Sequence, residues 1–231
     1  MISGRTISAS HFGAPPQHIA DLSFHKCFFD NCSLAQPPDP ERRSVIRNVS
    51  LVQCKQRASL LAGAVLDNVL VDGLGREGRI PLFLAGVVFR HVTLKGRLTF
   101  FKVQASPSVN HSSEQVALWQ AANRAFYAHT DWALDISEAR FTSGPDLHFI
   151  PGALVRIDPA SQALVSRRAL SGISLPGLPW AGSALRVALE WFLADSPYED
   201  VVLVAAKGTT YFQRDLAAIN MLREKGIAEP H

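Results

Sequence analysis

Apolar residues recur at five-residue intervals through the first half of the chain. The stretch LFLAG-VVFRH-VTLKG (Leu82–Gly96) is three successive five-residue units, centred on Leu84, Phe89 and Leu94. A helix would need apolar spacings of three and four, and a long half-buried strand would need alternation by two. Units with a small or β-branched residue first and a large apolar residue two positions later therefore predict short strands with a corner between them.

Looser copies of the same phrase occur earlier in the chain. They read LSFHK-CFFDN-CSLAQ from Leu22, SVIRN-VSLVQ-CKQRA from Ser44 and SLLAG-AVLDN-VLVDG from Ser59. Such self-similarity is typical of a solenoid, in which each turn buries its inner face against its neighbours. If the last two copies stack in register, Asp67 lies beside Arg90, and Asp72 lies beside Lys95.

The units share one sequence pattern, in which a small residue is followed two positions later by a large residue that is expected to point inward. It is met at Cys27-x-Phe29, Cys32-x-Leu34, Ala64-x-Leu66, Val69-x-Val71, Val87-x-Phe89 and Val92-x-Leu94. Over about residues 22–99 the chain therefore resembles the pentapeptide-repeat proteins, whose fold is a right-handed quadrilateral β-helix. The resemblance implies a mainly β fold class, an irregular right-handed β-helix with an inserted helix and a C-terminal α/β cap.

Other segments depart from the five-residue phrasing. Residues 1–20 are polar and broken by Pro15 and Pro16, and are interpreted as a leader. Glu114–Ala128 has apolar residues at helical spacing behind a capping serine, Ser112 or Ser113, and predicts an amphipathic helix. Two alternating apolar stretches around Asp158 in VRIDPASQALVS predict a hairpin.

The last sixty residues predict a helix, a strand and a second helix. Ser183–Ala194 is apolar nearly all round and predicts a mostly buried helix, and Asp200–Ala206 reads as a buried strand. A second helix is expected from Thr209 or Thr210 to about Lys225, ended by Gly226. We therefore expect a body over residues 1–170, with its helix at about 114–128, and a cap over residues 171–231 packed on it.

Composition narrows the function classes. Apolar residues make up 47% of the chain and charged residues 19%, which is globular composition. Residues 1–104 hold 13 Lys/Arg against 7 Asp/Glu. This basic balance argues against the DNA-mimicking version of pentapeptide-repeat proteins, which needs a strongly acidic face. No secretory or membrane-spanning run is recognised, so a cytoplasmic protein without a membrane partner is expected.

Metal, cofactor and nucleic-acid chemistry is not indicated by the motifs. The three cysteines, Cys27, Cys32 and Cys54, fall at small positions of the units and are interpreted as core residues. The eight histidines show no metal-ligand spacing, and no dinucleotide fingerprint or nucleic-acid motif is present. We therefore expect no cofactor, no metal and no nucleic-acid partner. Lys207–Thr210 suggests either an anion site or a simple helix cap, and the cap is favoured.

Candidate functional residues lie at outward positions of the units. The predicted partner-binding residues are Asp67, Asp72, Arg90, His91, Lys95 and Trp180, the last in a Pro/Gly-flanked loop. Trp119 and Trp191 are interpreted as core. A separate possibility is a groove lined by His129, Asp131 and Glu138 together with Trp132.

Three functions remain open on this evidence. The favoured hypothesis is a non-catalytic bacterial protein-binding protein of the immunity type, which neutralises a toxin or effector by direct binding. The alternative is a β-helix lyase or hydrolase acting on a polysaccharide, with the charged residues of adjacent coils in its groove. The third is a structural subunit that assembles by stacking of its ends, and the oligomeric state stays open.

Overall fold

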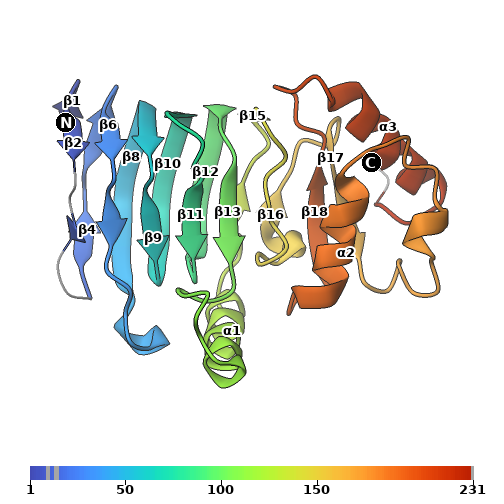
Figure 1. The fold of residues 1–231 in the computed structure, drawn as a ribbon, viewed down its shortest axis with the longest axis horizontal. Coiled ribbons are helices and arrows are strands. Elements are labelled where there is room, and N and C mark those ends of the chain that lie inside the picture. Colours follow the sequence, from blue (N-terminus) through green and yellow to red (C-terminus); the bar gives the residue numbers. More distant parts are fainter. Residues whose placement is uncertain (9–10, 13–15, 230–231) are drawn as a thin grey trace.

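The strands of the first two thirds of the chain form two sheets along an elongated body (Figure 1). The computed structural model describes residues 1–8, 11–12 and 16–229. The larger sheet contains β1 (Ile2–Ser3), β2 (Thr6–Ser8), β4 (His18–Ala20), β5 (Ser23–His25), β6 (Phe28–Asp30), β8 (Ser44–Arg57), β10 (Ala64–Arg76), β12 (Val88–Leu98), β14 (Leu134–Asp135), β15 (Ala139–Phe141) and β16 (Val155–Arg156). The smaller sheet contains β3 (His11–Phe12), β7 (Ser33–Leu34), β9 (Leu60–Ala62), β11 (Leu82–Ala85) and β13 (Phe101–Gln104).

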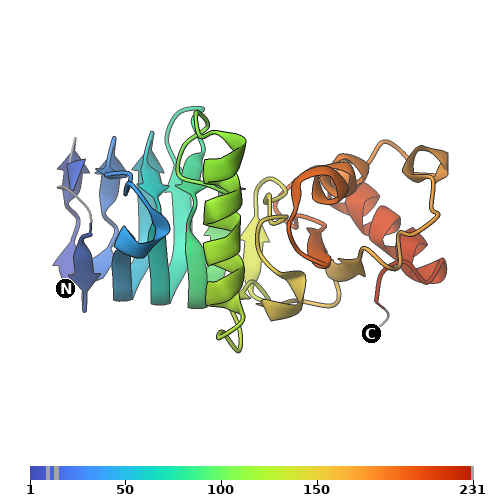
Figure 2. The ribbon, with the colours of Figure 1, turned by 90° about the horizontal axis from the view of Figure 1, so that it is seen from below.

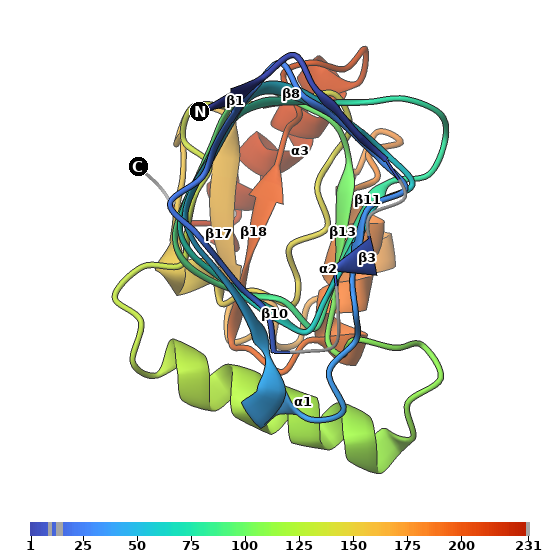
Figure 3. The same ribbon diagram turned by 90° about the vertical axis from the view of Figure 1, so that its left-hand side faces the viewer.

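The order of the strands shows how the chain runs. The larger sheet follows the path β1-β5-β8-β10-β12-β14-β16, and the smaller sheet follows β13-β11-β9-β7-β3. Neighbouring strands in both sheets pair in parallel, for example β8 with β10 and β9 with β11. Each pass of the chain therefore adds to both sheets beside the previous pass, and Figure 3 shows the passes superposed in outline when the molecule is viewed from its N-terminal end.

Left-handed backbone marks the ends of the five-residue units. Positive φ angles recur at every fifth residue through the central copies, at Asn48, Gln53, Ala58, Gly63, Asn68 and Gly73. Asn and Gly adopt this conformation at low cost, which explains why they are frequent at the last position of a unit. The predicted corners are thus confirmed, but they bend the strands without ending them, so that β8 continues through 14 residues.

The predicted fold class, mainly β with an irregular right-handed β-helix of pentapeptide-repeat type, is corrected by the structure. The fold is mixed α/β, with an 11-stranded sheet, a five-stranded parallel sheet and three α-helices. The five-residue repeat in the sequence predicts local corners of the backbone. These corners determine neither the length of the strands nor the helices that follow residue 112.

The register predicted between the last two copies is confirmed. β10 and β12 pair with Asp67 opposite Arg90 and Asp72 opposite Lys95. A shift by one residue would turn the apolar set outward, so the inward positions fix this register. The segment interpreted as a leader that could add a cap does pair with the body over its first eight residues, since β1 pairs with β5 and β2 pairs with β6. Pro15, part of the same prediction, lies outside the described residues.

Helix α1 (Ser113–Tyr127) confirms the predicted amphipathic helix. It lies outside the outline of the two sheets in Figure 3 and runs alongside the neighbouring strands in Figure 2. The Ser112 side chain accepts a hydrogen bond from the Gln115 backbone, and the Gln115 side chain accepts one from the Ser112 backbone, which is a capping box. The helix is held by Arg43, which donates to the Asn123 side chain and lies 4.8 Å from the Trp119 ring centroid. Burial lowers the pKa of Arg43 to about 10.

The C-terminal part contains α2 (Leu185–Asp195), β18 (Asp200–Val204) and α3 (Phe212–Glu224), which confirms the predicted helix–strand–helix order. The predicted hairpin around Asp158 is wrong: β16 joins the parallel sheet through β14, whereas β17 (Gln162–Ser166) pairs antiparallel with β18. The two short apolar stretches look like hairpin partners in sequence, but each finds a longer-range partner instead.

Two hydrophobic clusters occupy the body and the C-terminal part. Phe89, Phe141 and Ile150 belong to the first, and Val165, Leu189 and Ile219 belong to the second. The division expected after residue 170 stays a prediction, although the contacts group Ala163 and Val165 of β17 with the C-terminal cluster. Among the described residues, no helix combines the length and the apolar character needed to cross a membrane.

Candidate functional site

Most of the predicted partner-binding residues lie on one surface of the larger sheet, and here they are engaged with one another. We call this surface, with Arg47, Asp67, Arg90, Asp72 and Lys95, the ion-pair face. Asp67 accepts hydrogen bonds from Arg90 at 3.0 and 2.7 Å and from Arg47 at 2.8 Å. The Asp67 side chain is 10% exposed. One carboxylate thus joins three adjacent strands, β8, β10 and β12.

The charge of Asp67 is stabilised by this arrangement. The hydrogen bonds from Arg90, and secondarily those from Arg47, lower the pKa of Asp67 below its usual value, against the opposing effect of burial. Asp72 and Lys95 form a looser pair at 3.6 Å, with side chains 39% and 35% exposed. These carboxylates are therefore held by basic partners, and Asp67 in particular has little capacity left for a substrate or a protein partner.

His91 and the segment after α1 continue the ion-pair face. The His91 Nε2 atom lies 2.6 Å from Asp131, and this hydrogen bond lowers the pKa of Asp131. The His91 ring packs 4.9 Å from the Trp132 ring, and the Arg156 guanidinium lies 4.0 Å from the centroid of Trp132. His91 was predicted as an outward residue available to a partner, but it serves to join β12 to the segment that follows α1.

The suggested groove of His129, Asp131 and Glu138 is not formed as a hydrogen-bonded group. Asp131 contacts His91, the His129 backbone donates to Phe126, and the Glu138 carbonyl accepts from Gly96. No hydrogen bond links these three side chains to one another in the described part of the chain. Their closeness in sequence reflects a tight exit from α1 rather than a shared site.

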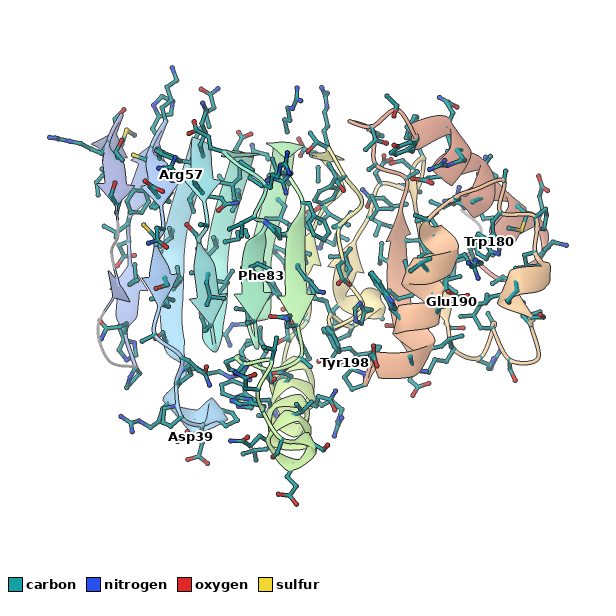
Figure 4. The ribbon with its side chains drawn as sticks, viewed as in Figure 1. Asp39, Arg57, Phe83, Trp180, Glu190 and Tyr198 are labelled. Carbon is teal, nitrogen blue, oxygen red and sulfur yellow. The ribbon has the colours of Figure 1, made fainter. Side chains whose placement is uncertain are left out.

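Two further sequence predictions concern tryptophans. For Trp180 the sequence leaves open a partner anchor or packing within the cap, with packing favoured. Trp180 is 7% exposed, and its indole N–H donates to the Leu175 carbonyl at 2.6 Å, which agrees with packing (Figure 4). Trp191, predicted as core, is 49% exposed on α2. The cysteine prediction is confirmed, since Cys27, Cys32 and Cys54 are buried and free.

A cleft lies where the C-terminal part meets the body, and sequence reasoning missed it. It consists of two adjoining cavities of about 610 and 520 Å³ that share Asp146, His148 and Trp191 in their walls. Tyr211 and Arg214 of the α3 region line the larger cavity. A space of this size accommodates a side chain or a small molecule. We refer to these two cavities with their shared walls as the cleft.

Asp146 and His148 form a buried pair in the wall of the cleft. Their side chains are 6% and 8% exposed, and His148 Nδ1 is hydrogen-bonded to Asp146 Oδ1. The second carboxylate oxygen, Oδ2, is buried and has no partner among the described residues. A buried polar atom without a partner is uncommon in folded proteins and calls for an explanation.

The rim of the cleft carries exposed aromatic side chains. Trp191 and Tyr211 are 49% and 56% exposed, and the Arg214 guanidinium lies 4.5 Å from the centroid of the Tyr211 ring. Trp191 also packs 6.4 Å from the His148 ring. Trp, Tyr and Arg are the residue types that dominate binding energy in protein interfaces.

The backbone at the base of the cleft is tightly joined. Gly208 N donates to the Phe141 carbonyl at 2.9 Å, and a Cβ atom at this glycine would lie 2.7 Å from the same oxygen. Gly208 is thus needed for close approach of two backbones rather than for a turn alone. Thr209 Oγ1 accepts from the Tyr211 backbone at 3.2 Å, and Lys207 pairs with Asp158. The helix cap predicted at Thr209 or Thr210 is not formed, because α3 has Tyr211 as its N-cap and receives no side-chain cap hydrogen bond.

Metal ligation finds no support, because no group of three or more His, Cys, Asp or Glu side chains suited to a metal ion occurs among the described residues. Comparisons with known protein families, with curated proteins and with solved structures found no match. The function must therefore be argued from the ion-pair face and the cleft themselves.

Proposed function

We propose that this chain is a non-catalytic cytoplasmic bacterial protein that binds another protein and inhibits it, as immunity proteins do with a toxin or effector. The observation that carries the proposal is the pairing of Trp191 and Tyr211, two half-exposed aromatic side chains at the rim of one cleft. Large aromatic side chains that face water beside a cavity bury apolar area on contact with a partner. The predicted site therefore moves from the ion-pair face to the cleft.

The polysaccharide alternative finds no comparable support. A glycosidase of the usual kind needs two carboxyl groups that are free to act as acid and as base or nucleophile. On the ion-pair face, Asp67 is committed to Arg47 and Arg90, and Asp72 lies beside Lys95. We do not advance that alternative further.

The proposal is tested by co-expression with the product of a neighbouring gene that arrests growth of the host. We expect the wild-type chain to restore growth, and the double variant Trp191→Ala/Tyr211→Ala to fail while remaining folded. Leu118→Ala is the matched control, because Leu118 is 55% exposed and lines neither cavity of the cleft.

Two results would contradict the proposal. If the double variant protects as well as the wild type, the cleft is not the binding surface. If the purified chain does not bind the neighbouring product at all, the inhibitor function itself is wrong for that pair. Circular dichroism of each variant separates loss of binding from loss of folding.

A further inference from the structure

The buried pair in the cleft leaves one carboxylate oxygen without a hydrogen-bond donor. Asp146 lies in the segment between β15 and β16, and its backbone forms an isolated parallel bridge with Lys102. The Asp146 carboxyl group is bonded to His148 through Oδ1, and its buried Oδ2 receives no hydrogen bond from the described residues. A buried oxygen without a donor favours a donor group beside it, and charged donors form the stronger hydrogen bonds.

His148 connects this carboxyl group to the cleft. An imidazole that donates its Nδ1–H to a carboxylate presents Nε2 as a hydrogen-bond acceptor. His148 Nε2 forms no hydrogen bond with the described residues, yet it is not among the fully enclosed unpaired atoms, so it reaches the surface of the cleft. We assign this tautomer to His148, so that the group that meets an occupant is an acceptor with the Asp146 carboxyl group behind it.

Trp191 supplies the opposite wall. Its ring centroid lies 6.4 Å from that of His148, and about half of the side chain is exposed. The face of an indole ring attracts cations within about 6 Å of its centroid. An acceptor nitrogen, a carboxylate behind it and an aromatic face together favour a positively charged group over a neutral or negative one.

We propose that the cleft binds a basic side chain, a lysine or an arginine, whose cation lies between the Trp191 ring and His148 Nε2. This inference rests on the proposed function, since it names the chemistry of the segment that the inhibited partner would insert. Two other charged side chains line the larger cavity. Arg214 lies over Tyr211 and 3.9 Å from Asp215, with its buried Nε unpaired among the described residues, and Asp215 accepts a hydrogen bond from Ser183.

Lys102 is the internal competitor for this position. It lines the smaller cavity together with Asp146 and Asp195, and it forms no ion pair with the residues that the structure describes. If the Lys102 ammonium reaches the pair in solution, the variant Lys102→Met should bind an external cation more tightly. If it does not, the variant should match the wild type, and weaker binding of a cation by Lys102→Met would contradict the proposed site.

The test uses the full chain and four small probes, and it needs no partner. N-acetyl-lysine amide and N-acetyl-arginine amide carry the cation, N-acetyl-glutamine amide is the neutral control, and N-acetyl-glutamate amide is the anionic one. Binding is followed by ¹H–¹⁵N NMR at the Trp191 indole and the His148 ring. We expect the two cationic probes to bind about tenfold more tightly than the neutral one, and added salt to weaken them.

Variants locate the effect. Asp146→Asn should remove the preference for cations, whereas Asp195→Asn, a change of the same kind at the edge of the smaller cavity, should preserve most of it. If Asp146→Asn does not fold, the relative affinities of the four probes for the wild type still test whether the cleft prefers a cation. Equal binding of the neutral and cationic probes, or tighter binding of the glutamate probe, would overturn the inference.

The two proposals fail in different ways. Protection of the host that depends on Trp191 and Tyr211, without any preference for cationic probes, would leave the inhibitor function standing and refute the basic side chain. A cation preference in the probe experiment without any protection would support the site and refute the inhibitor function for the neighbouring product.

Discussion

The ion-pair face and the cleft each contain a carboxylate beside basic side chains, but the two carboxylates differ in how completely they are paired. On the ion-pair face, the Asp67 carboxylate meets two arginines, and every one of its contacts joins neighbouring strands. In the cleft, the Asp146 carboxylate meets only a histidine, and one of its oxygens has no partner among the described residues. The first arrangement is complete within the chain, and the second is completed by an external group.

The charged side chains of the two regions also differ in their exposure to solvent. The arginines of the ion-pair face reach water, and Arg47 is 53% exposed. Their charges therefore cost little free energy, and their ion pairs are screened by solvent. The Asp146–His148 pair is almost fully buried, where a polar atom without a partner costs far more than it does in water. A protein retains such a group for a purpose other than stability, and this is why exposure and pairing together, rather than charge alone, separate a structural from a functional site.

The largest effect on stability is expected at the backbone that closes the cleft. Gly208→Ala places a methyl group 2.7 Å from the Phe141 carbonyl oxygen, and neither backbone can yield without separating α3 from β15. Overpacking of this kind costs about 2–3 kcal/mol of unfolding free energy. Urea denaturation measures the loss, and the NMR signals of Trp191 and Tyr211 should shift with it.

Gly144→Ala is the control for this prediction. Gly144 also lines the larger cavity, but a Cβ atom there meets nothing within 4 Å. We expect a change within about 0.5 kcal/mol, as for most surface substitutions. Equal effects at the two glycines would show that the cleft does not depend on the contact between Gly208 and Phe141.

A smaller but clear loss of stability is expected from Asp67→Ala. The change leaves Arg47 and Arg90 without their shared partner, and breaking a buried pair costs 3–5 kcal/mol when both groups are enclosed. Because Arg47 is 53% and Arg90 35% exposed, we reduce the expected loss to about 2 kcal/mol. Partner protection should be unchanged; loss of protection by a folded Asp67→Ala protein would return the binding site to the ion-pair face.

The pH dependence of the unfolding free energy should report the ion pairs of Asp67 through a smaller effect. The pKa of Asp67 is lowered in the folded state by Arg90 and Arg47, so its contribution is complete above the unfolded value of about 4. It is lost as pH falls through the lower folded value, because the unfolded chain then takes up the proton first. The difference in unfolding free energy between wild type and Asp67→Asn should therefore shrink below about pH 4. A difference that stays constant there would show that the pair does not perturb Asp67.

The sequence allowed the ion-pair face to be predicted in detail because its information is local. The five-residue repeat places corners at Asn48 and Asn68, and the repeat distance between two copies sets Asp67 opposite Arg90. The apolar spacing of α1 and the glycine that ends α3 are local signals too, and both helices were predicted from them. The repeat could not give the fold class, since corner residues say nothing of strand length or of the helices that follow.

The cleft could not be predicted because its walls come from distant parts of the chain. Asp146 and His148 lie in a loop, whereas Trp191 lies on α2 and reaches them only through tertiary packing. One signal was available. Ser183–Ala194 is apolar nearly all round, but Leu185, Leu189 and Phe192 already fill one face of the helix. Not every other apolar residue of this segment could be buried as well, and Trp191 and Leu193 are the two large ones that lie exposed.

The smallest effect is expected at the loosest pair of the ion-pair face, Asp72 and Lys95. Their charged atoms are 3.6 Å apart, and both side chains are more than one third exposed. A double-mutant cycle with Asp72→Ala and Lys95→Ala should give a coupling of at most about 0.5 kcal/mol, and less in high salt, because water competes for both charges. A coupling well above 1 kcal/mol would mean that exposure does not weaken ion pairs on this face. The difference between the ion-pair face and the cleft would then rest only on the Asp146 carboxyl oxygen that has no partner among the described residues.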